Sequence, residues 1–315
     1  MISKIQEIKK EVGKVVVGQE KMIDSILIAL LCEGHILIEG VPGLAKTTTV
    51  NALSKALGLN FKRAQFTPDL LPSDILGAEI YDPQTNQFKI KKGPIFTNLL
   101  LADEINRAPA KVQSALLEVM QEQQVTLGDT TFKLDLPFFV MATQNPVEQE
   151  GVYQLPEAQL DRFMLKLVVD YNTKVEELEI ARRISSGKFE EINEVLSRED
   201  LEKLKQAIKN IHVDEQVEEY MIELVNATRN PSEYGLDDIK EYIQFGASPR
   251  VSIDMFKAVK AMAFMRGKDF VTPVDVAYMA KELMRHRIVL SYEAEAEGVT
   301  TDQIIQKVLE AVDIP

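Results

Sequence analysis

The stretch HILIEGVPGLAKTT, residues 35–48, decides the fold of this 315-residue chain. It begins as a short apolar strand and passes through a glycine-containing turn into a helix predicted over residues 46–57. Glycines let the backbone curl so that its N–H groups point at phosphate oxygens, and the N-terminus of the following helix adds positive potential. This order of strand, loop and helix is what a phosphate-binding loop requires.

Two side chains of this loop have expected chemical roles. Lys46 would reach the β- and γ-phosphates of a nucleotide, and the Thr47 hydroxyl would bind Mg²⁺. The strict pattern has glycine in place of Ala45, but we expect alanine to be well tolerated there because the position starts the helix. The alternative is an ordinary Gly/Pro turn between a strand and a helix. The predicted nucleotide-binding residues of the loop are Gly40, Val41, Pro42, Gly43, Leu44, Ala45, Lys46, Thr47 and Thr48.

An acidic pair, Asp103 and Glu104, ends the apolar run of residues 95–104, which is predicted to finish as a buried strand. Because adjacent strand residues point in different directions, Asp103 can face Mg²⁺ while Glu104 faces the attacking water. Phosphoryl transfer needs both a held metal and an oriented nucleophile. A solvated acidic pair at a strand end is the alternative, and the phosphate loop upstream favours the catalytic interpretation.

Three further polar residues complete the candidate site. Asn145 ends the next apolar run, residues 137–146, and its neutral amide can bind water or the γ-phosphate without repelling it. The alternative for Asn145 is a turn signal, since it precedes a proline. Arg162 in LDRF and Arg250 in GASPR have the planar, permanently charged group that suits phosphate, although each could instead form a surface salt bridge.

The order of elements predicts an α/β fold with a helical domain after it. Helix-like segments alternate with apolar strand-like segments up to residue 171, which implies a parallel sheet flanked by helices. Beyond that point apolar residues recur at helical spacing and strand signals nearly vanish. We therefore predict an ATP-binding α/β domain over residues 1–171, and a linker with an α-helical lid over residues 172–315.

Composition excludes several classes of protein. Lys and Arg number 36 against 49 Asp and Glu, and the net charge of −13 disfavours non-specific nucleic-acid binding. No apolar run is long enough to span a membrane, and the N-terminal sequence is charged rather than signal-like. The single cysteine cannot form a disulfide within the chain, which agrees with a cytoplasmic location. The three scattered histidines show no metal-ligand spacing.

Taken together, these segments resemble the AAA+ superfamily of ATPases and, within it, the MoxR family. The resemblance rests on GVPGLAKT, LADEINRAP, ATQNPVEQEG, LPEAQLDRF and GASPR, and it covers nearly the whole chain. Alanine at the last glycine of the phosphate loop is typical of this family. The resemblance implies Walker A roles for Lys46 and Thr47, Walker B roles for Asp103 and Glu104, sensor 1 for Asn145, a finger given to a neighbouring subunit for Arg162, and sensor 2 for Arg250.

The resemblance also implies how the chain assembles. ATP and Mg²⁺ would bind with Val16, Val17, Gly18 and Gln19 lining the adenine site, and the subunits would form a ring, expected to be a hexamer. In the inferred strand order Arg162 lies on the far side of the sheet from the phosphate loop, so it should reach a neighbour's site. Arg107 is the alternative finger.

Two inserted loops belong to the same resemblance. Residues 73–96 match an insertion in helix 2, and their middle is predicted to form a hairpin with its turn at residues 83–86. Residues 125–137 match a second hairpin that precedes sensor 1. Such loops line the pore or the top face of related rings; alternatively, both hairpins only cover the edge of the sheet.

The resulting functional hypothesis is an ATP-hydrolysing remodeller or maturation chaperone for a partner protein. The family implies a partner that often carries a von Willebrand A domain, and a role in metal or cofactor insertion. The alternatives are a nucleic-acid motor, in which Lys89, Lys91 and Lys92 would touch phosphates, and a magnesium-chelatase-type motor subunit. A non-catalytic binding module is disfavoured by the intact set of Lys46, Asp103, Glu104 and Asn145.

Overall fold

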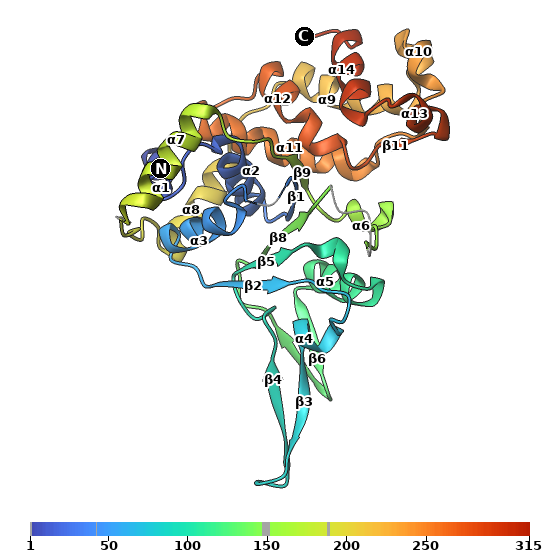
Figure 1. Ribbon diagram of the computed structural model, residues 1–315. Helices are drawn as coiled ribbons and strands as arrows, with labels where there is room; N and C mark the ends of the chain where they lie inside the picture. Colours follow the sequence, from blue (N-terminus) through green and yellow to red (C-terminus); the bar gives the residue numbers. More distant parts are fainter. Residues whose placement is uncertain (1, 42, 147–151, 188–189) are drawn as a thin grey trace. The chain divides into compact units, whose positions relative to one another are not determined.

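The computed structural model describes residues 2–41, 43–146, 152–187 and 190–315 (Figure 1). The chain divides into two compact units. The first comprises Ser3–Leu155 and Leu167–Asp200, and the second comprises Pro156–Lys166 and Leu201–Pro315. The boundary expected after residue 171 stays a prediction.

A five-stranded sheet runs through the first unit in the order β2-β5-β8-β1-β9. Its strands are β1 (Ile36–Glu39), β2 (Phe61–Gln65), β5 (Leu99–Asp103), β8 (Phe139–Gln144) and β9 (Leu165–Val168, whose first two residues are grouped with the second unit). The neighbouring pairs β2/β5, β5/β8 and β8/β1 are parallel, as the sequence predicts. The central strands β5 and β8 are buried over nearly their whole length, because both of their faces are covered.

Helices surround this sheet in Figure 1. They are α1 (Ile2–Gly13), α2 (Glu20–Leu31), α3 (Lys46–Ala56), α4 (Pro72–Leu76), the 3₁₀ turn η1 (Ile105–Arg107), α5 (Ala110–Glu122) and α7 (Lys174–Ser186). Helix α7 begins at a capping box in which Thr173 and Glu176 exchange side-chain and backbone hydrogen bonds. Arg183 then joins α7 to the end of α1, because its Nη1 donates to the carbonyl of Gly13 at 2.9 Å.

The strand order overturns one expectation. Strand β9, which follows Arg162, borders β1 rather than lying across the sheet from it. The backbone N–H of Val169, directly after β9, donates to Glu39 at the end of β1 at 2.8 Å. Strand order therefore does not separate Arg162 from the phosphate loop. Arg162 itself lies in the segment Pro156–Lys166, which is grouped with the second unit.

Both predicted hairpins are present in the first unit. Strands β3 (Gly77–Asp82) and β4 (Gln87–Lys92) form the longer hairpin, which projects from the sheet in Figure 1. Strands β6 (Gln124–Leu127) and β7 (Thr130–Lys133) form the shorter one. At the base of the longer hairpin, a Cβ on Gly77 would lie 2.3 Å from the carbonyl oxygen of Lys91, and one on Gly93 would lie 2.2 Å from that of Ile75. No side chain fits at either position.

The second unit is built mainly of helices packed around an apolar core. Its longer helices are α8 (Arg198–Lys209, which starts in the first unit), α9 (Glu215–Arg229), α11 (Pro249–Met265), α12 (Pro273–Met284) and α14 (Thr301–Ala311). Its shorter elements are α6 (Glu157–Leu160), η2 (Pro231–Tyr234), α10 (Asp237–Lys240), β10 (Ile243–Phe245), β11 (Val289–Leu290) and α13 (Tyr292–Glu297). The antiparallel pair β10/β11 is the exception to the expected all-helical lid. Across the described residues, we find no helix with the length and apolar character needed to cross a bilayer.

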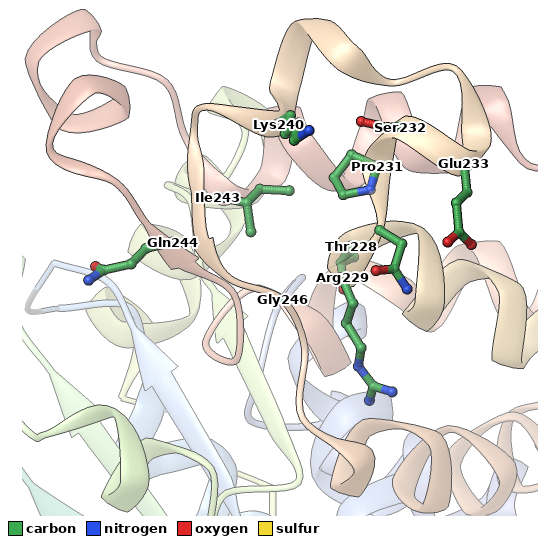
Figure 2. Close-up of a pocket in the computed structure, with 10 residues that line it drawn as sticks. Thr228, Arg229, Pro231, Ser232, Glu233, Lys240, Ile243, Gln244 and Gly246 are labelled. Carbon is green, nitrogen blue, oxygen red and sulfur yellow. The ribbon is translucent and has the colours of Figure 1, made fainter.

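A pocket of about 380 Å³ lies in this helical unit, beside the C-terminal end of α9 (Figure 2). Its lining mixes apolar and polar groups from residues 228–233 and from residues 240–246. Arg229 is partly committed to the fold, because its Nε donates to the carbonyl of Ala247 at 2.8 Å. None of the residues that line this pocket belongs to the predicted site.

Candidate active site

A pocket of about 400 Å³ opens in the first unit at the carboxyl ends of the parallel strands. This is the edge at which open α/β sheets bind ligands. The pocket brings together most of the residues that the sequence predicts, from segments far apart in the chain. It is lined by Gly40, Gly43, Leu44, Ala45, Lys46, Thr47, Thr48, Arg63, Asp103, Glu104, Thr143, Gln144 and Asn145.

Lys46 is the first residue of α3 and directs its ammonium group back across the loop. Its Nζ donates to the carbonyl oxygen of Gly40, the residue that follows β1. Burial lowers the pKa of Lys46, while the carboxylates of Asp103, Glu104 and Glu39 oppose that shift. A partly buried cation surrounded by carboxylates is well placed to receive the stronger negative charge of a polyphosphate.

The backbone corrects the expectation for Ala45. This residue is the N-cap that precedes α3, and it has left-handed dihedral angles, φ 55° and ψ 21°. It is therefore not in the helical conformation for which alanine is well suited. A left-handed alanine costs roughly 1–2 kcal/mol because its Cβ approaches the backbone, so the phosphate loop stores strain at this position.

We expect Ala45→Gly to raise the free energy of unfolding by about 1 kcal/mol, since glycine adopts positive φ without this penalty. Chemical denaturation followed by circular dichroism measures the change. Ala181→Gly is the matched control, because Ala181 is exposed within α7 and the same exchange there should destabilise by about 1 kcal/mol. A loss of stability in both variants would contradict the strain at Ala45.

Asp103 ends β5 and is held by side chains from both neighbouring strands. Its Oδ1 accepts a hydrogen bond of 2.6 Å from the Thr143 hydroxyl on β8. Its Oδ2 accepts from Arg63 on β2, at 2.6 Å from Nη2 and 3.0 Å from Nε. One carboxylate oxygen is thus fixed by the sheet, whereas the other is occupied by a half-exposed arginine that a metal ion could displace.

Glu104 points into the site for a reason that the sequence does not reveal. Strand β5 stops at Asp103, and Glu104 has φ 56° and ψ 50°, so strand alternation does not set its direction. Its backbone N–H donates to the Thr143 hydroxyl at 2.9 Å. Its Oε2 accepts from Gln65 Nε2 at 2.7 Å and from Arg107 Nη1 at 3.0 Å. A non-glycine residue held in this region of φ/ψ space is typical of functional positions.

Three residues that position the acidic pair were missed from the sequence: Arg63, Gln65 and Thr143. They lie in β2 and β8, and their positions near the carboxyl ends of these strands were the available signal. Their roles depend on register, since Gln65 is directly opposite Asp103 in the β2/β5 pair. Asn145 follows β8 and lines the same pocket.

The segment expected to line the adenine site lies outside this pocket but is well anchored in the same unit. Gly18 and Gln19 have left-handed dihedral angles, with φ 68° and φ 58°. Asn172 fixes the segment by donating to the carbonyl of Val17 at 3.2 Å and by accepting from Gln19 Nε2 at 2.6 Å. Val41 does not line the pocket, and Pro42 is outside the described residues.

The two predicted arginines both belong to the second unit. Arg250, near the start of α11, donates from Nη1 to the carbonyl of Asp161 at 3.1 Å and lies 3.6 Å from its carboxylate. Arg162 is half-buried, and no hydrogen bond or ion pair of its side chain is found within the described ranges. The finger and sensor 2 roles of these residues stay predictions.

The oxygen donors of the pocket fit a magnesium ion bound together with phosphates. Thr47 and Asp103 offer hard oxygen ligands, and Mg²⁺ takes few protein ligands because it retains waters and substrate phosphates. A cage of three or more carboxylate, imidazole or thiolate groups is absent from the described residues, and this mode of binding does not need one. Thr47, Asp103 and the loop N–H groups would hold the metal and the nucleotide.

Comparison with known proteins finds matches over nearly the whole chain. The model of the ATPase family associated with various cellular activities (AAA) matches residues 35–165, and that of the AAA lid domain matches residues 237–308. The chaperone MoxR1 of Mycobacterium tuberculosis is 46% identical over 97% of this chain and 81% of its own length. YeaC of Bacillus subtilis is 44% identical over 97% and 93%. A crystal structure from Cytophaga hutchinsonii is 54% identical and superposes with a TM-score of 0.94, covering 100% of this chain and 96% of that one.

Proposed function

Because the chain belongs to the MoxR family of AAA+ ATPases, we propose that it hydrolyses ATP and uses the released energy to remodel or mature a partner protein. The family assignment and the α/β fold followed by an AAA lid confirm what the sequence predicts. One observation carries the catalytic part of the proposal. The phosphate-loop lysine, the acidic pair and Asn145 line a single pocket at the end of a parallel sheet.

In this proposal each group has one task in the reaction. Lys46 and the N–H groups at the start of α3 bind the β- and γ-phosphates, which fixes the scissile bond. Glu104 orients the attacking water and accepts its proton, and Asn145 holds that water or the γ-phosphate by its neutral amide. Mg²⁺, when bound, supplies positive charge that stabilises the phosphate oxygens in the transition state. Arg63 and Gln65 restrain Asp103 and Glu104 until the nucleotide arrives.

Lys46→Ala tests nucleotide binding directly. We expect ATP affinity to fall by about tenfold to a hundredfold, because a charge-assisted hydrogen bond to phosphate contributes roughly 1.5–3 kcal/mol. Isothermal calorimetry with ATP and Mg²⁺ measures this loss. Lys55→Ala, near the end of the same helix, is the control and should bind normally. Unchanged affinity in Lys46→Ala would show that the pocket is not a phosphate site.

The proposed partner is a protein, and the β3–β4 hairpin is its proposed contact. Tyr81 and Phe88 are 47% and 67% exposed, and their rings pack together with centroids 5.4 Å apart. Exposed aromatic pairs of this kind are typical of protein interfaces. Among relatives, MoxR1 of Mycobacterium tuberculosis is named a chaperone, which supports a protein substrate here. A partner with a von Willebrand A domain, and metal or cofactor insertion, belong to the same proposal.

A nucleic-acid role is less well supported by the same hairpin. Lys89 pairs with Asp82, and Lys92 lies over the rings of Phe96 and Phe132 at 4.8 Å and 5.1 Å. Two of the three lysines that could touch phosphates therefore already have partners in the chain.

Replacing both aromatic residues of the hairpin, Tyr81→Ser with Phe88→Ser, should separate partner binding from catalysis. Basal ATPase activity should be retained, since no residue of the hairpin is among those that line the pocket. Binding of the partner recovered by co-purification from native cells should weaken by roughly tenfold or more, the usual effect of removing aromatic hot spots. Tyr292→Ser, at a residue that is 86% exposed in the second unit, is the control. Loss of basal activity would mean that the hairpin is structural.

A further inference from the structure

The segment that carries Arg162, Pro156–Lys166, accepts hydrogen bonds from three consecutive side chains that directly follow α12. Arg285 Nη1 donates to the carbonyl of Lys166 at 3.0 Å. His286 Nε2 lies 2.9 Å from the carbonyl of Phe163. Burial holds the pKa of His286 well below its ordinary value, so the ring is neutral and Nε2–H donates to that carbonyl.

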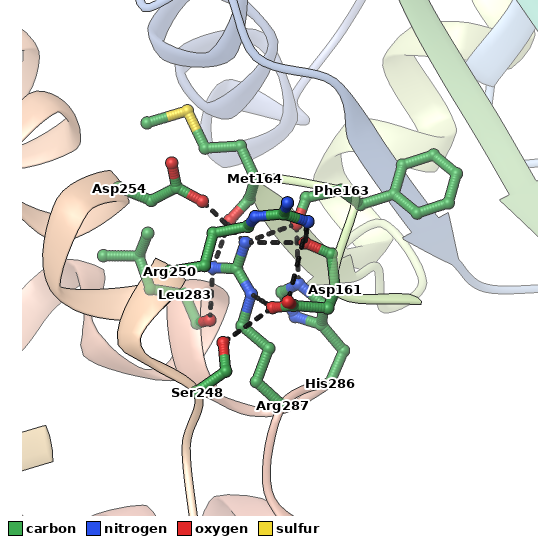
Figure 3. A network of polar contacts seen from close by, with 9 residues as sticks. All are labelled: Asp161, Phe163, Met164, Ser248, Arg250, Asp254, Leu283, His286 and Arg287. Carbon is green, nitrogen blue, oxygen red and sulfur yellow. Dashed lines mark hydrogen bonds and ion pairs between the residues drawn. The ribbon is translucent and has the colours of Figure 1, made fainter. Parts of the chain in front are cut away.

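Arg287 is the centre of this arrangement (Figure 3). Its Nη2 donates to the carbonyl oxygens of Asp161 and Phe163 at 3.2 Å and 2.9 Å, and its Nη1 donates to that of Met164 at 3.3 Å. The side chain is only 1% exposed. The planar fork of arginine can bind several acceptors in fixed directions, which the point charge of lysine cannot do.

The same guanidinium also joins two acidic side chains from different elements. Its Nε donates to Asp161 Oδ1 at 2.9 Å, and its Nη2 donates to Asp254 Oδ2 at 2.6 Å. Asp254 lies on α11, one helical turn after Arg250, and Asp161 also accepts from the Ser248 hydroxyl at 2.8 Å. A buried charge of this kind is retained only when it is fully paired, so the contacts hold one another in place.

Arg162 lies between two residues whose carbonyl oxygens accept hydrogen bonds from Arg287. Asp161 before it and Phe163 after it both accept hydrogen bonds from Arg287, which fixes the backbone on either side. Its own side chain shows neither a hydrogen bond nor an ion pair in the part of the chain that the structure describes. The backbone is therefore held firmly while the guanidinium is left available.

We propose that Arg287 is a positioning residue that fastens the Arg162 segment to helix α11, so that the finger offered to a neighbouring subunit is held in a fixed position. The inference rests on the proposed function, in which Arg162 acts in trans. A displacement of about 1 Å at a reacting centre can lower the rate on the order of 10²-fold. Loosening the segment should therefore weaken catalysis in the active site of the neighbouring subunit.

The experiment uses mixed assemblies that separate giving a finger from receiving one. Mixed with Arg162→Ala subunits, Arg287→Lys subunits serve the Arg162→Ala active sites as finger donors. At interfaces with Lys46→Ala subunits, they act only as receivers of an intact finger, because the Lys46→Ala sites are inactive. Asp161→Asn is the second variant in case Arg287→Lys fails to fold, since Asp161 is partly exposed. Arg266→Lys is the matched control, because Arg266 pairs with the buried Asp275 in the same unit and does not contact the finger segment.

In the donor mixture, we expect Arg287→Lys to lower ATP turnover on the order of 10²-fold relative to wild-type donors. In the receiver mixture, the loss of ATP turnover should be at least tenfold smaller than in the donor mixture. ATP affinity should not change in either mixture. Asp161→Asn should show the same asymmetry, and Arg266→Lys should show none. Equal losses in both mixtures, or no loss in the donor mixture, would overturn the inference alone. If Arg162→Ala and Lys46→Ala subunits fail to recover activity together despite co-assembly, the trans finger itself is wrong and the inference falls with it.

Discussion

Arg162→Ala should lower ATP turnover per subunit by on the order of 10³-fold or more, while ATP binding stays close to normal. The transition state gathers negative charge on the γ-phosphoryl oxygens, and a finger arginine counters that charge only at that stage. Among the described residues, the pocket lining contains Arg63 but neither Arg162 nor Arg250. Steady-state phosphate release, together with calorimetric ATP titration, distinguishes lost catalysis from lost binding.

Subunit mixing tests whether this arginine acts on a neighbour. Lys46→Ala and Arg162→Ala proteins should each be nearly inactive alone and should recover activity when mixed, at interfaces that pair an intact Lys46 with an intact Arg162. Turnover per subunit of the wild-type protein should also rise with protein concentration as rings form. Concentration-independent turnover with no recovery on mixing, despite confirmed co-assembly, would contradict a finger given in trans.

Arg107 is the alternative finger, and the structure gives it a competing contact. Its Nη1 lies 3.0 Å from Glu104 Oε2 of the same subunit, and its side chain is 40% exposed. The carboxylate of Glu104 is the one proposed to orient water, so Arg107 contacts the active site of its own subunit. If Arg107→Ala, and not Arg162→Ala, showed recovery on mixing, the finger would be reassigned while the ring proposal would stand.

Glu104→Gln should bind ATP with unchanged affinity and hydrolyse it about 10²- to 10⁴-fold more slowly, the usual contribution of a general base. The amide keeps the size of the carboxylate and can still accept the hydrogen bond from Gln65, but it cannot take a proton from water. Single-turnover hydrolysis measured with excess protein isolates this chemical step. The variant should also accumulate assembled, ATP-bound rings in light scattering.

Glu118→Gln provides the control for this exchange, because Glu118 is exposed on α5 and lacks the pocket contacts of Glu104. It should leave turnover at the wild-type level. Normal turnover in Glu104→Gln would remove this residue from the mechanism. Loss of ATP affinity instead of turnover would mean that Glu104 contributes to binding rather than to activating water.

Local pattern was sufficient to predict the framework of the site. The buried runs that become β5 and β8 are strongly apolar, and each is followed by polar residues, so the ends of the strands and their ligands were visible together. The longer hairpin was predicted because turn residues separate its β-forming segments, whereas the shorter one was implied by the family resemblance. These features depend on residues that are close together in the sequence, so they can be recognised from one sequence alone.

Long-range geometry was not predictable in the same way. The position of β9 beside β1 depends on how the chain crosses the sheet, and apolar runs do not encode that order. The left-handed backbone of Ala45 was hidden because alanine is ordinarily a helix former. The roles of Arg63, Gln65 and Thr143 follow from strand register, which places side chains from distant segments around one acidic pair.

The glycines at the base of the β3–β4 hairpin have an evolutionary consequence. Neither Gly77 nor Gly93 can carry a side chain, because backbone atoms of other residues lie too close. The point at which the hairpin leaves the core is therefore fixed by close contact between backbone segments. The residues beyond that point are largely exposed and contribute little to the packing of the sheet. Surface segments of this kind tolerate substitution and change of length. A hairpin inherited from another lineage would therefore join the core at the same backbone junction, and its exposed surface could change without altering the packing of the sheet.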